Sequence, residues 1–204
     1  MDEIELVKRC QLGDIEAFGM LIEKYTNKAV RTAYLATGQK DLAEDIAQEA
    51  FMQCFKTIKN LKNIEYFKTW FYRILIRTSW RMATKARQHS QNVFTDINNL
   101  EDTLPDTSNI LEEVEKKQRY KAIYAAINEM DKIFREVIIL YYFNEFSIKE
   151  IANILSCRDG TVKSRLHKAR KLLADIFTDK ELNNSSNEFQ LRKESNFNGR
   201  TRIV

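Results

Sequence analysis

The chain has 204 residues, of which 44% are apolar, and a formal net charge of +4. This apolar content is enough to bury a core and excludes a chain that is disordered throughout. Because the charge excess is small, any affinity for nucleic acid must depend on where the basic residues lie. Five glycines and a single proline leave few strand turns, so the predicted fold is all-α.

The cysteines and the N-terminal residues narrow the protein class further. Cys10, Cys54 and Cys157 are far apart and form no Cys-x-x-Cys pair, which argues against a disulfide framework and a zinc knuckle. The first residues, MDEIELVKRC, lead into no long apolar run, and no segment approaches the roughly 20 apolar residues of a membrane helix. We therefore expect a cytoplasmic protein with no cofactor, no metal and no direct membrane insertion.

The first predicted domain, residues 1–88, has three long helices with recognisable ends. Asp14 is placed to cap one helix and Gly38 to end it. Asp41 and Glu44 resemble a capping box that opens the next helix, DLAEDIAQEAFMQCFKTI. The loop NLKNIE then leads into a long helix through YFKTWFYRILIRTSWRMATKAR.

The DLAEDIAQEAF helix carries an apolar stripe and an unusual outer face. At helical spacing its alanines pack inward with Phe51 and Cys54, whereas carboxylates and two apolar side chains, Met52 and Phe55, project outward. Apolar side chains among exposed carboxylates indicate a protein-binding surface, since a partner would remove them from water. The candidate contact residues on this surface are Asp45, Gln48, Glu49, Met52 and Phe55.

The long helix that follows combines regularly spaced cations with aromatic rings. Its cations recur every four residues and so stack along one side: Arg73, Arg77, Arg81 and Lys85. A cationic row beside rings is typical of single-strand capture, in which charges follow the backbone and bases stack on rings. Several neighbouring aromatics have core spacing, which leaves three rings that could meet a base: Tyr66, Tyr72 and Trp80.

Residues 89–111 differ in composition from both flanks and predict a linker. The segment HSQNVFTDINNLEDTLPDTSNI contains the single proline and shows weak periodicity. Seven acids and no Lys or Arg occupy residues 96–115, so this stretch should repel a phosphate backbone and is interpreted as a solvated spacer. A second domain is predicted over 112–178, followed by a polar, disordered tail over 179–204.

The second domain contains a predicted helix-turn-helix, in which SIKEIANIL is followed by the turn SCRD and a further helix. Ser147 and Glu150 form a capping box for the first of these helices. The second helix has an apolar stripe formed by Val162, Leu166, Ala169 and Leu173. A solvated basic face is the alternative interpretation of its other side, but no Asp or Glu occurs from 161 to 174 to neutralise it, and double-stranded DNA is favoured. The candidate DNA contacts are Thr161, Lys163, Ser164, His167, Lys168 and Lys171.

With these pieces in order, the chain resembles a bacterial RNA polymerase sigma factor of the sigma-70 family, in the small extracytoplasmic-function (ECF) group. The resemblance covers about residues 5–177 and implies an N-terminal helical bundle and a C-terminal helix-turn-helix domain of four helices, joined by a flexible acidic linker. It implies that the helix matching DLAEDIAQEAF binds the clamp helices of core polymerase and that GTVKSRLHKAR reads the −35 promoter element. The segment matching NLKNIEYFKTWFYRI would recognise and melt the −10 element. The candidate −10 residues are Asn63, Tyr66, Lys68, Trp70, Arg73, Arg77, Trp80 and Arg81.

The resemblance also implies a set of partners. These are core RNA polymerase, through its clamp helices and flap, promoter DNA and an anti-sigma factor. No small-molecule substrate and no catalytic centre are expected, since no nucleophile, base and orienting group converge in the sequence. The chain departs from the family pattern at Arg77 and Arg81, where Asn and Asp are usual, so charge is expected to contribute more to contacts with the melted strand.

Two other classes of protein stay open. A stand-alone helix-turn-helix regulator would bind an operator without polymerase and would use its first domain to dimerise or to sense a ligand. A helical metal-dependent hydrolase would use Glu44, Asp45 and Glu49 as ligands. Such a site wants Glu-x-x-His pairs on facing helices, and the two histidines, His89 and His167, lie in the linker and on the basic helix.

Overall fold

The structure, a computed structural model, describes residues 2–89 and 122–176. These residues form helices and turns and contain no strand, which confirms the predicted all-α fold. The predicted linker, 89–111, lies outside the described residues except for its first residue, His89, which is the last residue of a helix and not part of a linker. The predicted tail 179–204 also lies outside them. In the described ranges, no helix is both long enough and apolar enough to cross a membrane.

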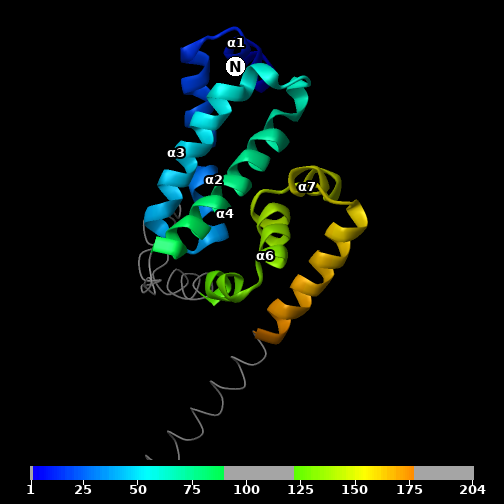
Figure 1. The fold of residues 1–204 in the computed structure, drawn as a ribbon. Coiled ribbons are helices and arrows are strands. Elements are labelled where there is room, and N and C mark those ends of the chain that lie inside the picture. The colour runs from blue at the N-terminus through cyan, green and yellow to red at the C-terminus, as the bar shows by residue number, and fades with distance from the viewer. Residues whose placement is uncertain (1, 90–121, 177–204) are drawn as a thin grey trace, which may run out of the picture.

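The N-terminal part, residues 2–89, is a bundle in which the long helices pack side by side (Figure 1). Its elements are α1 (Glu3–Gln11), α2 (Ile15–Thr37), α3 (Lys40–Thr57), the short 3-10 turns η1 (Ile58–Asn60) and η2 (Ile64–Tyr66), and α4 (Phe67–His89). Aromatic rings fill the centre. The ring of Phe71 stacks on Phe51 with centroids 4.9 Å apart and meets the edge of Tyr25 at 5.4 Å. The core therefore joins α2, α3 and α4 through contacts between rings.

Two of the three predicted helix ends in this part are confirmed. The Asp14 carboxylate accepts a hydrogen bond from the Ala17 backbone N–H at 3.0 Å, and Gly38 ends α2 in the left-handed region with φ of 73°. The capping box at Asp41 is wrong, because α3 begins at Lys40 and its N-cap, Gln39, makes no side-chain cap. Asp41 lies inside the first turn of α3 and not at its N-cap, and its charge there favours the helix N-terminus.

The C-terminal part, residues 122–176, contains the predicted helix-turn-helix. Its elements are a helical segment over 122–129, α6 (Lys132–Ile138), a π-helical turn η4 (Ile139–Phe143), α7 (Ile148–Leu155) and a helix over 159–176. The capping box at the start of α7 is confirmed, since Ser147 and Glu150 bond each other's backbone N–H groups. The π-helical turn was not predicted. It closes where the Asn144 N–H donates to the carbonyl of Ile139 at 3.1 Å, five residues back.

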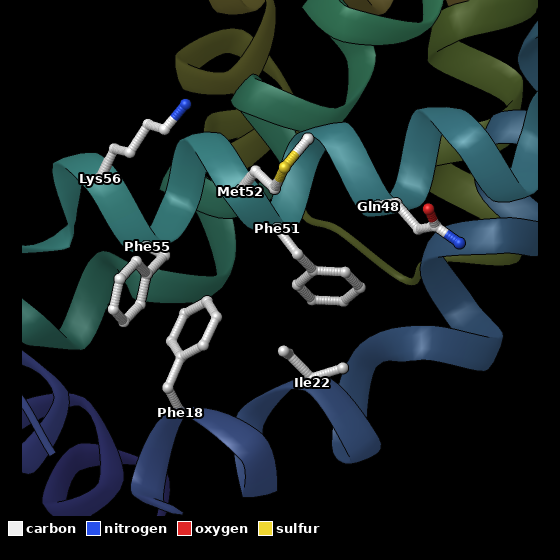
Figure 2. A pocket seen from close by; sticks show the side chains of 7 residues that line it. All are labelled: Phe18, Ile22, Gln48, Phe51, Met52, Phe55 and Lys56. Atoms are coloured by element: carbon white, nitrogen blue, oxygen red, sulfur yellow. The ribbon is translucent and has the colours of Figure 1, made fainter. Parts of the chain in front are cut away.

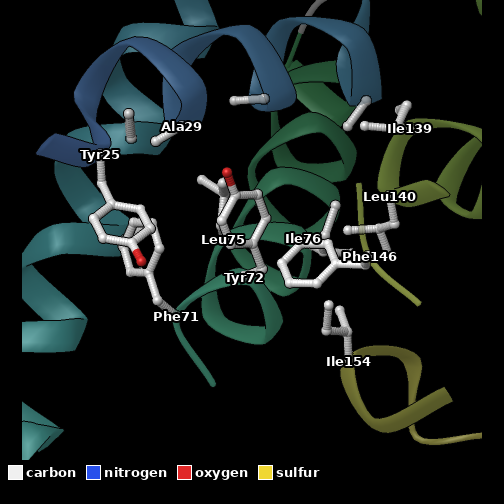
Figure 3. Packing of buried hydrophobic residues seen from close by; sticks show 14 of the residues in the cluster. Tyr25, Ala29, Phe71, Tyr72, Leu75, Ile76, Ile139, Leu140, Phe146 and Ile154 are labelled. Carbon is white, nitrogen blue, oxygen red and sulfur yellow. The ribbon is translucent and has the colours of Figure 1, made fainter. Parts of the chain in front are cut away.

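The two parts lie in direct contact and share one apolar core. The elements α6, η4 and α7 pack on α2 and α4. In Figure 3 the ring of Tyr72 on α4 faces Phe146, and the two centroids are 4.8 Å apart. Ile139 and Leu140 from η4 and Ile154 from α7 join the same buried cluster. The arrangement of the two parts is therefore set by packing as well as by the chain connection.

Candidate polymerase and nucleic-acid interfaces

The outer face of α3 has the mixed character that the sequence predicts. Asp45 and Gln48 are exposed, and so are two large apolar side chains, Met52 at 51% and Phe55 at 46%. The opposite side of α3 is buried as predicted: Ala43, Ala47, Ala50, Phe51, Cys54 and Ile58. The five candidate polymerase contacts therefore lie on one side of the helix, with Glu49 half-buried at its edge.

An apolar pocket of about 440 Å³ opens beside these side chains, between α3 and α2 (Figure 2). The Phe55 ring lies against Phe18 of α2, with centroids 5.0 Å apart at an angle of 62°. The pocket is lined by Phe18, Ile22, Gln48, Phe51, Met52, Phe55 and Lys56. The contribution of α2 was not predicted, although Phe18 and Ile22 stand four residues apart on one side of that helix. The surface is therefore a groove formed by two helices.

Glu49 connects the α3 surface to the cationic row on α4. Its carboxylate accepts from the Gln53 amide at 2.8 Å and from the Arg81 guanidinium at 2.9 Å. These two hydrogen bonds stabilise the charged carboxylate and hold the pKa of Glu49 below its usual range. The bond from Gln53 has the larger effect. A candidate polymerase contact and a candidate −10 contact are thus paired with each other in this structure.

The candidate −10 residues just before α4 and in its first turns line part of a second hollow, of about 320 Å³. The Asn63 side chain accepts from the Glu65 N–H at 3.2 Å and so fixes the turn before α4. Tyr66 is 57% exposed at the mouth, and Trp70 is half-buried in the wall. Asn153 of α7 also lines this hollow, so the C-terminal part lies at its edge.

The cationic row on α4 makes contacts within the chain. The Arg73 guanidinium donates to the backbone carbonyl of Asn153 in α7, and Arg77 donates to the Ser156 hydroxyl at 3.4 Å. The structure thus places the predicted row along one side of α4. Its first two members reach α7 and the residue that caps it, whereas Arg81 bonds to Glu49 of α3 and Lys85 is exposed.

Two further candidate −10 residues on α4 are covered by the C-terminal part. The Lys68 ammonium lies 4.5 Å from the centre of the Phe146 ring. The Trp80 ring lies 4.8 Å from the Lys132 ammonium of α6. Such cation–ring contacts are attractive when the ring face is shielded from water.

Tyr72 leaves the set of rings that could meet a base. Its side chain is fully buried, and burial raises the pKa of its phenol to about 12. Its hydroxyl accepts a hydrogen bond from the Asn144 amide at 3.2 Å. Tyr72 therefore belongs to the apolar core with Phe71 and Leu75 and not to the cationic row. The core at this point includes residues from both parts of the chain.

The helix over 159–176 separates an inner stripe from an outer basic face. Val162, Leu166 and Ala169 are buried, as predicted. The outer face is exposed at Lys163, Ser164, His167, Lys168 and Lys171, and Thr161 is half-buried at its start. The turn before this helix is set by Ser156, which adopts the left-handed conformation with φ of 53° at the end of α7.

Arg170 lies outside the free basic face even though it belongs to the same basic run. Its Nε donates to the Tyr142 hydroxyl at 2.8 Å, and its guanidinium lies 5.5 Å from the Tyr141 ring centre. The basic residues of the helix therefore divide into Arg170, which is held by η4, and the exposed side chains of the outer face.

Two family models match the chain at these two sites. A model of sigma-70 region 2 matches residues 21–89, and a model of sigma-70 region 4 matches residues 120–173. Together they span more than half of the chain. The chain belongs to the sigma-70 family. The first match contains the α3 surface and α4, and the second contains the helix-turn-helix.

Curated relatives resemble this sigma-70 protein along most of its length. The RNA polymerase sigma-H factor of Pseudomonas aeruginosa is 27% identical over 177 residues, which cover 83% of this chain and 90% of that protein. The ECF RNA polymerase sigma factor SigW of Bacillus subtilis is 29% identical over 184 residues, which cover 85% and 95%. The sigma-70 protein belongs to the ECF group.

A solved structure supports the same fold. The sigma factor RpoE from Bartonella quintana, in complex with the anti-sigma factor NepR, superimposes with a TM-score of 0.64 at 22% identity. The match covers 79% of this chain and 96% of that one. The two-domain helical architecture of the sigma-70 protein is therefore shared with a solved sigma factor.

The described residues give no support to the metal-dependent hydrolase. Within residues 2–89 and 122–176, no three His, Cys, Asp or Glu side chains are grouped as ligands for a metal ion. Glu44 and Asp45 are exposed, and Glu49 is paired with Arg81. Membership of the sigma-70 family supports a non-catalytic role.

Proposed function

We propose that this sigma-70 protein is an alternative sigma factor that binds core RNA polymerase and directs it to promoters through −10 and −35 elements. One observation carries the proposal. A capped helix-turn-helix presents an exposed basic face, free of acids, in a chain whose first part carries an apolar groove among carboxylates. A regulator that acts alone needs the first surface, whereas a sigma factor needs both.

The groove between α2 and α3 is the proposed contact with core polymerase. Phe55 and Met52 offer apolar area to a helical partner such as the clamp helices, while Asp45 and Gln48 supply a polar rim. Exposed aromatic side chains at the centre of such a patch commonly carry much of the binding energy. The flap of the polymerase would contact the C-terminal part, and an anti-sigma factor would compete for these surfaces.

The helix over 159–176 is the proposed reader of the −35 element. Lys163 and Lys168 can reach guanine acceptors or phosphates in the major groove, and Ser164 can bond either. Val162 and Leu166 hold the opposite side of the helix in the core. The basic face therefore stays fixed in orientation when it meets the duplex.

The turn before α4 is the proposed site for an unstacked base of the −10 strand. Tyr66 is exposed, Trp70 lines the hollow, and Asn63 offers amide groups at its rim. Arg73 and Arg77 would follow the backbone of the strand once their bonds to α7 are broken. Residues 1–88 would act as the polymerase and −10 domain, and 112–178 as the −35 domain, in a cytoplasmic protein without catalytic activity of its own.

Transcription with purified core polymerase tests this function. The chain should produce run-off transcripts from a subset of a genomic fragment library, and core polymerase alone should not. A double variant, Glu49→Ala with Phe55→Ala, should lose co-purification with core polymerase while its circular dichroism stays helical. A control double variant, Glu44→Ala on α3 with Lys59→Ala in the η1 turn that follows it, should retain it. Tight binding to an operator without polymerase, together with no transcript from any fragment, would favour the stand-alone regulator.

A further inference from the structure

Gly19 is an exposed glycine inside α2, at a position where glycine weakens a helix. It is the fifth residue of this 23-residue helix, and glycine in a helix interior is less favourable than alanine because it loses more backbone freedom on folding. Among the described residues, a Cβ atom built at Gly19 would meet nothing within 4 Å. Residues 2–89 and 122–176 therefore give no steric reason for the missing side chain.

Two other glycines have a conformational reason that Gly19 lacks. Gly13 and Gly38 lie where the chain turns, with φ of 94° and 73°, a region that favours glycine. Gly19 lies inside a continuous helix and has no positive φ. A further use of glycine is to let another backbone approach closely. The surroundings of Gly19 on the outside of α2 fit this use.

The surface around Gly19 is apolar and continues the groove between α2 and α3. At helical spacing Gly19 shares one face of α2 with Ile15 and Ile22. Ile15 is 73% exposed, and Ile22 lines the groove together with Phe18. Figure 2 shows Phe18 and Ile22 projecting from α2 toward the side chains of α3. An apolar strip thus runs along α2 from Ile15 to Ile22, with a gap in its side chains at Gly19.

The shape of this surface suits an α-helix. Packed helices insert side-chain ridges into each other's grooves, and their axes lie about 8–10 Å apart, depending on the side chains at the contact. A glycine at the contact allows the short end of that range. On the α3 side, Met52 and Phe55 are 51% and 46% exposed and form the other wall of the groove. A helix laid between these walls would cross α2 where the gap at Gly19 lies.

Carboxylates border the surface on both helices. Glu16 and Glu23, three residues before and four residues after Gly19, are exposed on α2. On α3 the exposed Asp45 lies three residues before Gln48, which lines the groove. A partner with basic side chains on its flanks would complement these carboxylates, and complementary charge selects one partner over others. The matching helix is therefore apolar along its centre and basic along its edges.

From this shape and charge we propose that Gly19 is the point at which one helix of core polymerase crosses α2 at close range. The absent side chain sets the distance between the two helices. It thereby lets the partner reach Met52 and Phe55 at the same time as Ile15, because a larger residue at position 19 would hold the partner away from all three. Gly19 is thus a residue that determines affinity for the partner. The inference rests on the proposed function, which places polymerase in this groove.

Adding a side chain at position 19 tests the proposal on the full chain. Gly19→Leu fills the gap, whereas Asn27→Leu adds the same side chain at another exposed position of α2 that does not line the groove. Affinity for purified core polymerase is measured by biolayer interferometry. Gly19→Leu should bind at least about tenfold more weakly than wild type, the usual size of a steric conflict in a packed contact. Asn27→Leu should bind like wild type, and equal affinities of the two variants would overturn the proposal.

A smaller substitution separates an effect on binding from an effect on folding. Gly19→Ala should raise the urea midpoint above that of wild type, because alanine favours the helix and the added methyl group meets no neighbour. Its affinity for core polymerase should fall, although less than that of Gly19→Leu. Stability and affinity then change in opposite directions, which a purely structural role of Gly19 would not produce. A higher midpoint with unchanged affinity would contradict the close contact.

The charge of the partner is tested at the border of the surface. Glu23→Lys should weaken binding to core polymerase, and the loss should become smaller at high salt, because salt screens the interaction. Glu5→Lys, at an exposed position of α1, makes the same change in net charge. Equal losses of affinity in both variants would show that net charge acts alone, and the basic edges of the partner helix would be ruled out.

The same assays separate this proposal from the proposed function. If wild type and Gly19→Leu bind core polymerase and support transcription equally, the close contact fails and the function stands. If wild type binds no core polymerase, the function fails and the close contact fails with it. Size-exclusion chromatography tests a second copy of the chain as the occupant. A wild-type dimer that Gly19→Leu abolishes, with polymerase binding unchanged, would overturn the assignment to polymerase.

Discussion

α4 and the helix over 159–176 both carry a row of basic residues, but the two rows differ in the partners that they have within the chain. On α4, Arg73, Arg77 and Arg81 donate to oxygen acceptors within the chain. On the helix over 159–176, Lys163 and Lys168 are exposed. Helical periodicity identifies which residues share a face, but it does not say what lies opposite that face. Whether a basic row is free for DNA depends on which element packs against it.

The largest effect is expected from removing the ring that joins the two parts. Phe146→Ala should destabilise the chain by about 3–5 kcal/mol, the usual cost of truncating a buried Phe, because it removes the contacts with Tyr72 and Lys68. Urea denaturation followed by circular dichroism measures this loss. Ile133→Ala on α6, 43% exposed, should change stability by less than about 0.5 kcal/mol. Equal losses of unfolding free energy in both variants would mean that the Phe146 ring does not stabilise the contact between the two parts.

The free basic face can be tested by reversing one of its charges. Lys168→Glu should weaken binding to double-stranded promoter fragments by about 1–3 kcal/mol, the usual value of one DNA contact. Footprinting should show the loss in the −35 region and not in the −10 region. Lys28→Glu on α2 makes the same change in net charge away from this face. Similar weakening by both substitutions would mean that the effect comes from net charge alone.

A buried carboxyl gives the C-terminal part a pH dependence. Burial raises the pKa of Glu136, although Lys132 and Arg165 oppose the shift. The folded chain thus holds this proton more tightly than the unfolded chain does. Glu136 therefore adds stability as the pH falls from neutral through its raised pKa, and this stability is lost as the pH rises. Glu136→Gln should be more stable than wild type at pH 7.5, and the difference should shrink by pH 5.

Urea midpoints of wild type and variant at the two pH values measure this difference. Glu145→Gln, at an exposed position nine residues along the chain, serves as the control, and its difference from wild type should be the same at both pH values. If wild type and Glu136→Gln differ in urea midpoint by the same amount at both pH values, the raised pKa of Glu136 is contradicted.

The smallest effect is expected at the pair that links α3 to α4. Arg81→Gln removes the bond to Glu49, but the Arg81 side chain is 60% exposed, and exposed ion pairs contribute less than about 1 kcal/mol. The loss of unfolding free energy caused by Arg81→Gln should become smaller still at high salt, because salt screens the ion pair. Lys85→Gln, the next position in the row, is exposed and should be neutral. A loss for Arg81→Gln that does not respond to salt would indicate a packing role instead of an ionic one.

Most local features could be predicted from the sequence because they depend on neighbouring residues. The cap at Asp14, the stop at Gly38 and the capping box of α7 follow from short-range hydrogen bonds and backbone preferences. The buried stripe of the helix over 159–176 follows from its periodicity. The start of α3 was misplaced because the helix begins at Lys40 without any side-chain cap, so no capping signal in the sequence marks it.

The positions that escaped prediction depend on residues far apart in the chain. Tyr72 was predicted as a possible base contact, but the packing of η4 and the segment around Phe146 against α4 buries it. The π-helical turn at η4 aims Asn144 at α2 and α4, and no periodic signal marks such a turn. Phe18 and Ile22 joined the groove through the packing of α2 against α3.

The sequence by itself determined the helices, the two basic rows, the apolar residues on the outside of α3 and the family of the chain. These depend on spacing along one helix and on short motifs, which are local properties. The tertiary structure alone decided which basic residues have partners within the chain, because that depends on where α3 and α7 pack against α4. The free energy of that packing comes from contacts such as Tyr72 with Phe146 and Asn144 with Thr32, which join residues that are distant in the chain.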